Sequence, residues 1–390
     1  MRKDFLPYCR PALSDFELTG ALQTLRDGWL TTGPSVRRFE EAFKEVSGVR
    51  NAVAMSSCTA ALHVALRAFG VGPGDEVVMP SLTFVAGAQC TMELGATPVF
   101  ADIDPLTLCV TPETIERVLS PRTRVIVPMP YAGRPLNIAA IVELAHARGI
   151  KVLEDAAHAA GTLDRGEWAG MRSDAAAYSF YATKNLTTCE GGMLLTNDDA
   201  LAERARVLAM HGMDRDAWKR YTASGSWRYD VTEPGYKYNL PDPFAAIGLA
   251  QLHRLPEMQA RRHELAALYA TALAGIDGIN VPPPVDGAGN VMSWCMYVVT
   301  VDEYTAGIGR NALIEALREA NIGTSVHYVP THLMSAYKSW ATGTCPETER
   351  MWTGLLSLPL FPSMSNDDVA DVAGAIEGIV ARYSKPKRIA

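Results

Sequence analysis

The sequence lacks the features that mark membrane proteins and nucleic-acid-binding proteins. No apolar run is long enough to span a bilayer, and too little apolar sequence follows Met1-Arg2-Lys3-Asp4 for a signal peptide. The formal net charge is −7, and the only basic run is the short tail Lys385-Pro386-Lys387-Arg388. We therefore expect a cytoplasmic protein with no membrane contact and no nucleic-acid partner.

Cysteine is sparse and scattered. The seven cysteines are odd in number and include no C-x-x-C pair. This pattern predicts neither a disulfide framework nor a zinc site, so we expect no metal and a reduced compartment. The sequence also lacks a Walker A loop and a dinucleotide-binding glycine fingerprint.

The composition is that of an ordinary globular protein, with 48% hydrophobic and 20% charged residues. At 390 residues the chain is long for one hydrophobic core, so we expect a large domain and a smaller one. The shift in composition at Val281-Pro282-Pro283-Pro284 suggests where the small domain begins. We predict a large cofactor-binding domain with N-terminal helices at 1–250, and a long helix with a small C-terminal α+β domain at 251–390.

Apolar runs and helical stretches alternate through the first half of the chain. Repeated strand–helix units predict a mostly parallel sheet that is covered by helices on both faces. Ligands of such sheets bind at the carboxyl ends of the strands. The predicted strands are 52–55, 76–79, 97–101, 125–128, 151–153, 175–180 and 192–196, and the helices among them include 85–93, 112–119 and 138–148.

Helices are also predicted near both ends of the chain. Two amphipathic helices lie between residues 15 and 48, on either side of Leu30-Thr31-Thr32-Gly33-Pro34, a loop that is either a plain connector or part of a site. The segment 213–238 has no periodicity and is too long for an ordinary loop, which is typical of functional or disordered segments. The other predicted elements are successive helices at 245–252 and 259–273, strands at 297–301 and 324–328, and helices at 310–320 and 367–383.

One lysine stands in an unusual setting. Lys184 lies in the aromatic, hydroxyl-bearing run Tyr178-Ser179-Phe180-Tyr181-Ala182-Thr183-Lys184-Asn185, which Glu190-Gly191-Gly192 follows closely. A lysine amine with its ordinary pKa of about 10.4 becomes a nucleophile near neutral pH only if desolvation or a neighbouring cation depresses that pKa. Lys184 is thus either a Schiff-base lysine or a lysine that extends over apolar neighbours to reach water.

Two other segments offer groups that a lysine-bound cofactor needs. Asp155 follows a predicted strand, and a carboxylate buried there needs a cationic or hydrogen-bonding partner, which a protonated ring nitrogen would supply. The alternative is an aspartate that caps a helix. Ser57-Cys58-Thr59 opens a predicted helix, where the free N–H groups suit an anion, although a serine N-cap explains the same residues.

Together these groups make a pyridoxal phosphate site chemically coherent. Lys184 would form the Schiff base, and Asp155 would pair with the ring nitrogen and keep it protonated so that the ring can accept electrons. The other residues that we expect to contact the cofactor are Cys58, Thr59 and Ser179 at the phosphate and Phe84 on the ring.

The motifs also resemble a known family. They occur, in this order, at 57–62, 74–77, 83–85, 98–104, 154–158, 179–185 and 190–192. This order resembles the DegT-type nucleotide-sugar aminotransferases of the fold-type I pyridoxal phosphate superfamily. The resemblance implies an α/β fold with a mostly parallel seven-stranded sheet between helices, a smaller α+β C-terminal domain, and a homodimer with shared active sites.

Within that family the likeness is nearest to the aminotransferase that makes UDP-4-amino-4-deoxy-L-arabinose, through residues 154–158, 234–240 and 323–328. It implies that His158 lies against the cofactor ring and acts with Lys184 and Asp155, and that Asn239 reaches the cofactor phosphate of the neighbouring subunit. The residues that we expect at the substrate are Thr32, Lys237, Tyr238, His327 and Tyr328.

The resemblance implies transfer of the amino group of L-glutamate to C4 of a nucleotide-linked 4-keto sugar, with a UDP-4-keto-pentose favoured. Alternatives are a 4-keto-6-deoxyhexose on UDP, dTDP or GDP, and a non-catalytic regulator or a dehydratase on the same scaffold. In the dehydratase branch histidine replaces the Schiff-base lysine, so Lys184 argues against that branch. Two residues depart from the family pattern: Pro130, where relatives commonly have histidine, and Cys58, where glycine or alanine is more usual.

Overall fold

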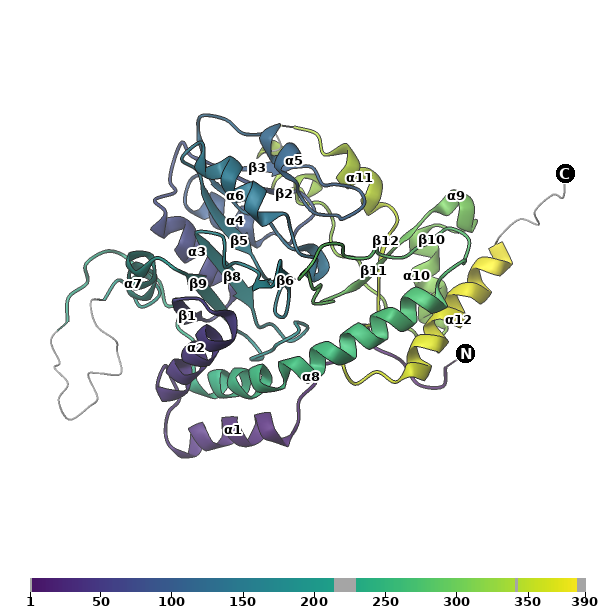
Figure 1. Ribbon diagram of the computed structural model, residues 1–390, viewed down its shortest axis with the longest axis horizontal. Helices are drawn as coiled ribbons and strands as arrows, with labels where there is room; N and C mark the ends of the chain where they lie inside the picture. The colour runs from purple at the N-terminus through teal and green to yellow at the C-terminus, as the bar shows by residue number, and fades with distance from the viewer. Residues whose placement is uncertain (1, 214–228, 341–342, 384–390) are drawn as a thin grey trace.

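The computed structural model describes residues 2–213, 229–340 and 343–383 of the chain (Figure 1). Most of the predicted irregular segment 213–238, residues 214–228, lies outside the described residues. Within the described ranges, no helix is long and apolar enough to cross a membrane. All seven cysteines lie in these ranges, and each is a free thiol.

A seven-stranded sheet forms the centre of the larger part, in the order β1-β9-β8-β5-β4-β2-β3. Strands β3, β2, β4, β5 and β8 run parallel, whereas β9 is antiparallel to both β8 and β1. The expected fold class, a mostly parallel seven-stranded α/β sheet, is therefore confirmed. The strands are β1 (Asn51–Met55), β2 (Glu76–Pro80), β3 (Thr97–Ala101), β4 (Thr123–Ile126), β5 (Lys151–Asp155), β8 (Ala175–Ser179) and β9 (Gly192–Thr196).

Helices cover both faces of this sheet. Successive strand residues point to opposite sides, so the apolar strands present side chains that need cover on both faces. In β8, Ala175 and Ala177 belong to the core beneath α3 and α7, whereas Ala176 and Tyr178 belong to the core beneath α2. The helices next to the sheet are α2 (Pro34–Ser47), α3 (Cys58–Ala68), α4 (Ala86–Glu93), α5 (Pro112–Glu116), α6 (Ile138–His146) and α7 (Asp199–Leu208). Short elements complete this part: β6 (Leu163–Asp164), β7 (Glu167–Trp168) and the 3-10 turn η1 (Tyr131–Gly133).

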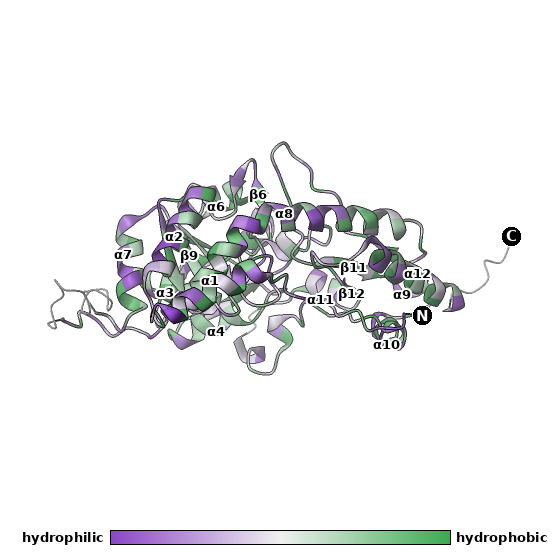
Figure 2. Cartoon of the chain, turned by 90° about the horizontal axis from the view of Figure 1, so that it is seen from below, coloured by the Kyte–Doolittle hydropathy of each residue, from purple (hydrophilic) through white to green (hydrophobic). Residues whose placement is uncertain are grey.

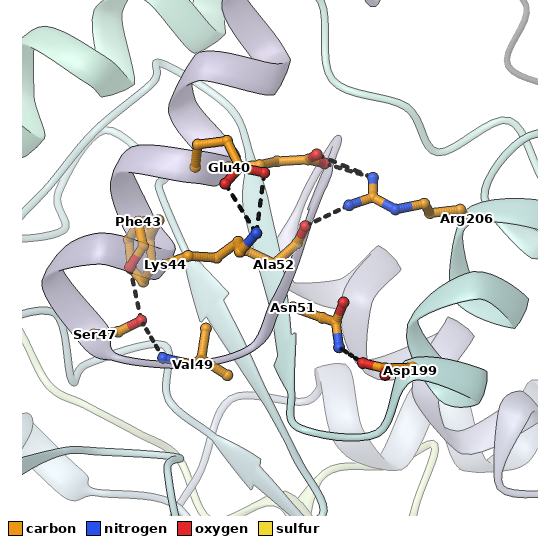
Figure 3. Close-up of polar contacts among 10 residues, drawn as sticks. Glu40, Phe43, Lys44, Ser47, Val49, Asn51, Ala52, Asp199 and Arg206 are labelled. Carbon is orange, nitrogen blue, oxygen red and sulfur yellow. Dashed lines mark hydrogen bonds and ion pairs between the residues drawn. The ribbon is translucent and has the colours of Figure 1, made fainter.

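An ion pair with a buried carboxylate fastens α2 to the edge of the sheet (Figure 3). Glu40 lies 3.0 Å from the guanidinium of Arg206 on α7. Glu40 also accepts a hydrogen bond of 2.8 Å from the N–H of Ala54. Arg206 also donates to the carbonyl oxygen of Ala52, at 2.8 Å. One side chain on each helix thus joins α2, β1 and α7.

Helix α8 (Asp242–Ala272) is one continuous helix of 31 residues. The two successive helices predicted for this region are therefore wrong, and Pro256 lies inside the helix without ending it. Figure 1 shows α8 beginning between α2 and α1 (Asp15–Arg26) and running toward the smaller part that carries α12. The predicted domain boundary after residue 250 falls within α8, and that division remains a prediction.

The smaller part has an antiparallel three-stranded sheet, in the order β10-β11-β12, which packs against α10 and α12. The predicted strand at 297–301 and the predicted helices at 310–320 and 367–383 are present. The predicted strand at 324–328 is wrong, because only one bridge, Ser325 to Ser357, forms there. The elements are β10 (Ile279–Asn280), β11 (Tyr297–Val301), β12 (Leu355–Leu358), α9 (Glu303–Ala306), α10 (Arg310–Glu319), η3 (Thr331–Leu333), η4 (Lys338–Trp340), α11 (Pro346–Trp352) and α12 (Asn366–Tyr383).

Candidate active site

The predicted catalytic groups meet at the carboxyl ends of two neighbouring parallel strands. Asp155 is the last residue of β5, Ser179 is the last residue of β8, and the loop after β8 carries Lys184. Lys184 is half-buried. Burial raises the pKa of Asp155 and the Lys184 charge opposes that rise, whereas burial lowers the pKa of His158 and the Lys184 charge lowers it further. The amine therefore lies within electrostatic reach of both side chains, at the sheet edge where ligands of this fold class bind.

Asp155 is a buried carboxylate without a cationic partner in contact. It is 5% exposed, and no ion pair among the described residues includes it. Burial raises its pKa, and the N–H of Ala157 at 3.2 Å, the charge of Lys184 and the Cys58 thiol oppose that rise. A buried carboxylate in this condition gains stability from a protonated ring nitrogen placed against it.

The Cys58 side chain points inward, beneath the site. Its Sγ lies 3.3 Å from the carbonyl oxygen of Ala177 and 3.8 Å from Oδ1 of Asp155. Burial raises the pKa of the Cys58 thiol well above its ordinary value, and the charge of Asp155 raises it further. Cys58 therefore stays protonated and donates to β8 and to Asp155, in addition to any contact through its backbone N–H.

The first turn of α3 is open to an anion. Ser57 is the N-cap, and its hydroxyl accepts the N–H of Ala60 at 3.0 Å, so the serine cap is present. No hydrogen bond within the described ranges uses the N–H of Cys58 or of Thr59, and Thr59 is exposed. A Cβ on Gly192 would lie 2.5 Å from the Cys58 nitrogen, so only glycine lets β9 pack this closely against the helix start.

His158 is held in place with one ring nitrogen unsatisfied. The side chain is 2% exposed, and its Nε2 lies 2.9 Å from the hydroxyl of Tyr328, whose ring is nearly parallel to it at 14°. Among the described residues, Nδ1 is buried and has no partner. Burial lowers the pKa of His158 well below its ordinary value, and Lys184 and His327 lower it further, so the ring is neutral.

Three other aromatic or histidine side chains border this group. Tyr131 donates its hydroxyl to the carbonyl oxygen of His327, and its ring lies 6.3 Å from that of His158. Burial and the charge of Lys184 lower the pKa of His327 to about 4. Phe84 is 55% exposed, and its ring lies 5.9 Å from that of Tyr328. These contacts bring His327, Tyr328 and Phe84 to one side of the site.

The remaining predicted residues form a second group beside β1. Asn239 donates from Nδ2 to the hydroxyl of Thr32 at 2.8 Å, and Lys237 donates to its Oδ1. The carbonyl of Tyr238 accepts the N–H of Ser56 at 2.7 Å, so this segment lies next to the strand that leads into α3. Within the part of the chain that the structure describes, no hydrogen bond joins this group to Lys184.

The Tyr238 side chain lies against α3. Its hydroxyl lies 3.2 Å from Nδ1 of His63 on α3, and its ring stacks on Tyr236 at 4.9 Å. Sequence analysis missed two residues of the site, Tyr131 and Ser293. Tyr131 follows β4 at the same sheet edge, which could have indicated it, whereas Ser293 lies 135 residues from His158, whose carbonyl it contacts, with no signal around it.

The described residues fit pyridoxal phosphate. The buried carboxylate of Asp155 suits the ring nitrogen, the uncapped N–H groups of α3 suit the phosphate, and the amine of Lys184 suits the aldehyde. The unsatisfied Nδ1 of His158 is a further polar atom that a bound ring could meet.

Comparison with known proteins agrees with this geometry. The family model for the DegT/DnrJ/EryC1/StrS aminotransferases matches residues 11–377. The spore coat polysaccharide biosynthesis protein SpsC of Bacillus subtilis is 47% identical over 383 residues, which cover 97% of this chain and 98% of SpsC.

Solved structures of lower sequence identity superpose over nearly the whole chain. The aminotransferase TlmJ from Streptoalloteichus hindustanus superposes with a TM-score of 0.90 at 38% identity, covering 97% of this chain and 99% of TlmJ. The putative sugar aminotransferase Spr1654 from Streptococcus pneumoniae, in its PLP form, superposes with a TM-score of 0.89 at 28% identity, covering 98% and 100%. The chain belongs to the DegT/DnrJ/EryC1/StrS aminotransferase family and is a nucleotide-sugar aminotransferase whose cofactor is pyridoxal phosphate.

Proposed function

We propose that the protein transfers the amino group of L-glutamate to C4 of a nucleotide-linked 4-keto sugar, and we favour a UDP-4-keto-pentose. One observation supports the reaction type: Lys184, in the loop after β8, lies within electrostatic reach of Asp155, a buried carboxylate at the end of β5 with no cation in contact in the described part of the chain. The sugar preference rests on the sequence likeness at residues 154–158, 234–240 and 323–328.

Lys184, Asp155 and His158 carry the chemistry in this proposal. Pyridoxal phosphate supplies an electron sink and a carrier for the amino group. The Lys184 amine would hold the cofactor and, when free, could carry a proton at Nζ. Asp155 would keep the ring nitrogen protonated, and the neutral ring of His158 would lie against the cofactor.

The remaining residues divide between cofactor and substrate. We propose that Cys58, Thr59 and Ser179 bind the phosphate and that Phe84 contacts the ring. The substrate side is built from the exposed polar group beside β1 and from the aromatic side of the site. The proposed substrate residues are Thr32, Lys237, Tyr238, His327 and Tyr328.

We also propose a homodimer in which Asn239 of the partner subunit completes each phosphate site. The orientation of α1 supports a partner. Leu18, Leu22 and Leu25 lie on one side of this helix and are each about half exposed, at 50%, 51% and 48%. An apolar face of this kind on a helix indicates a protein interface.

The buried side of α1 is polar, which fixes that orientation. Glu17 is fully buried and accepts hydrogen bonds from Gln251 at 2.7 Å and Arg254 at 2.8 Å, both on α8. The amphipathic helix predicted here is present, but it docks through its polar side and leaves its apolar side for another surface. Figure 2, seen from below, has α1 on the near side of the molecule.

The pathway and compartment are proposed on separate grounds. We propose that the amino sugar enters a polysaccharide, which the similarity to SpsC supports. A lipopolysaccharide is the corresponding product if the pentose is the substrate. We place the reaction in the cytoplasm, where the seven free cysteines suit a reducing environment.

A turnover panel tests the proposal. With L-glutamate as donor, more than one equivalent of 2-oxoglutarate per subunit should appear only with a 4-keto sugar, and it should appear fastest with the UDP-4-keto-pentose. If the fastest substrate is instead a 4-keto-6-deoxyhexose on UDP, dTDP or GDP, that sugar replaces the pentose in the proposal. Failure of every sugar to support repeated release of 2-oxoglutarate would indicate a non-catalytic regulator or a different acceptor. Lys184→Ala should lower turnover by about 10³-fold or more. Lys44→Ala, at a surface ion pair with Glu41, is the matched control and should match the wild type.

Borohydride reduction of the protein with pyridoxal phosphate bound tests independently whether Lys184 is the lysine that binds the cofactor. Peptide mass analysis should find the reduced cofactor on Lys184 in the wild type and on no peptide of Lys184→Ala. Normal turnover by Lys184→Ala would overturn the mechanism.

A further inference from the structure

A turn at residues 292–295 is fixed from one side by helix α8. Three α8 side chains donate to three successive backbone carbonyls of this turn. Gln259 reaches the carbonyl of Ser293 at 2.7 Å, Arg262 that of Trp294 at 3.1 Å, and His263 that of Met292 at 2.8 Å. Trp294 has a φ of 49°, in the left-handed region, so the chain turns sharply there.

Ser293 connects this turn to the active site through hydrogen bonds. It is fully buried, and its hydroxyl donates to the backbone carbonyl of His158 at 2.7 Å. Its N–H donates to the carbonyl of Gly133 at 3.1 Å. Its carbonyl accepts a second hydrogen bond of 2.7 Å, from Nδ2 of Asn185, the neighbour of Lys184.

The hydroxyl of Ser293 lies close against the backbone of Gly133. A Cβ on Gly133 would lie 1.9 Å from this hydroxyl and 2.8 Å from the carbonyl oxygen of His158. Gly133 also has a φ of 85°, which favours glycine. The backbones of Gly133, His158 and Ser293 are therefore in close contact, and only glycine fits at position 133.

Asn185 is oriented as firmly as Ser293. It is 4% exposed, and its Nδ2 faces three acceptors: the carbonyl of Ser293 at 2.7 Å, Oε1 of Gln259 at 3.3 Å and the carbonyl of Ala160 at 3.4 Å. Because all three neighbours are acceptors, only one orientation of the amide satisfies them. The loop that carries Lys184 is thus tied to the same carbonyl that α8 holds.

We propose that Ser293 and Asn185 are positioning residues that set the orientation of His158 and Lys184 toward the cofactor. This inference rests on the proposed roles of those two side chains. A buried hydrogen-bond network is worth more than isolated bonds because a lost member leaves its partner unsatisfied. A displacement of a catalytic group by a fraction of an ångström is sufficient to change cofactor binding and rate.

The chain offers a matched control for Ser293. Thr162 is also fully buried, and its hydroxyl donates at 2.7 Å to the carbonyl of Gly133, which Ser293 also contacts. Ser293→Ala and Thr162→Val each remove one buried hydroxyl donor from a backbone carbonyl in the same region. Only Ser293→Ala removes a bond to His158.

Cofactor binding separates the two variants. We expect both to melt at lower temperature than the wild type, by similar amounts. Ser293→Ala should bind pyridoxal phosphate about tenfold more weakly and shift the midpoint of the pH titration of the bound cofactor's visible absorbance. Thr162→Val should keep the wild-type affinity and midpoint. Equal affinities and midpoints in the two variants would overturn the inference.

A second measurement needs neither sugar nor cofactor. In the apoprotein, hydrogen exchange of residues 181–188 should be faster in Ser293→Ala and Asn185→Ala than in Thr162→Val. If Ser293→Ala does not fold, Asn185→Ala carries the same comparison. If no 4-keto sugar supports turnover but the variants still differ in hydrogen exchange, only the proposed substrate is refuted. Equal hydrogen exchange in all three variants would refute the positioning role.

Discussion

At the scale of single residues, Glu154 is a second buried acid beside the site. It precedes Asp155 on β5, is 2% exposed, and accepts a hydrogen bond of 3.0 Å from the hydroxyl of Ser173. Burial raises the pKa of Glu154 to about 7, although the bonds from Ser173 and the Gly170 N–H oppose it. Glu154 therefore keeps its proton at a pH where an ordinary glutamate has lost it.

This raised pKa predicts how stability depends on pH. The unfolded chain releases the Glu154 proton near 4.5 and the folded chain near 7, so the unfolded state binds fewer protons between those values and stability falls as pH rises. Glu154→Gln mimics the protonated acid. We expect it to exceed the wild type by up to about 3 kcal/mol at about pH 8 and to match it below about pH 4.

Chemical denaturation across this pH range checks the expectation. Glu45→Gln, at an exposed position on α2, is the control, and its stability should follow the wild-type curve. A Glu154→Gln curve parallel to the wild-type curve would show that Glu154 is ionised in the folded protein throughout.

Site residues could be predicted from the sequence where they follow the end of a strand. Lys184 and Asp155 were found because strand periodicity fixes where β8 and β5 stop, and parallel strands share an edge. The inward direction of the Cys58 thiol could not be predicted, because it depends on how closely β9 approaches α3. Ser293 could not be found either, because its contact with His158 depends on the position of a turn that α8 holds.

At the scale of elements, α2 begins with a cap from a distant part of the chain. Its N-cap is Gly33, which has no side chain to accept the first N–H groups. Asp242, at the start of α8 and 1% exposed, accepts them instead. Its carboxylate binds the N–H groups of Gly33 at 2.8 Å, Ser35 at 3.0 Å and Val36 at 3.0 Å. The loop at 30–34 is thus an anchor between helices and not a plain connector.

Removal of this cap should cost more than removal of a local one. Asp242→Ala leaves three N–H groups without their acceptor in a buried place, so we expect a loss of about 2–3 kcal/mol. Asp198→Ala, at the N-cap of α7, removes two such bonds at the surface and should cost about 1 kcal/mol. Urea unfolding of both variants checks the difference, and equal losses would mean that water replaces Asp242.

Elements were predicted well where one face is apolar and poorly where distant contacts decide. The central strands have strong apolar runs between glycine-rich turns, so their existence was clear. The antiparallel position of β9 has no local signal, because it depends on which strands pair. Pro256 and the polar residues near it suggested two helices, but packing on α1, α2 and α12 keeps α8 continuous. The segment 324–328 has strand-like residues but only a single bridge to pair with.

At the scale of the whole molecule, the two groups of predicted residues point to an assembly. The catalytic group around Lys184 and the group of Thr32, Lys237 and Asn239 are not joined by hydrogen bonds within the described chain. A dimer that buries the apolar side of α1 would let each chain present its second group to the other. Shared sites of this kind follow the symmetry of a two-fold interface, in which each contact occurs twice.

Mixed dimers test this arrangement directly. Lys184→Ala removes the amine, and Asn239→Asp places a carboxylate where a phosphate is proposed to bind, so each homodimer should be nearly inactive. If Asn239 serves the partner's site, a mixed dimer contains one intact site, with Lys184 from one chain and Asn239 from the other. Equal mixing with exchange of subunits should then restore about a quarter of the wild-type turnover. If Asn239 serves its own chain, every site in the mixture carries one defect and turnover stays at the level of the separate variants.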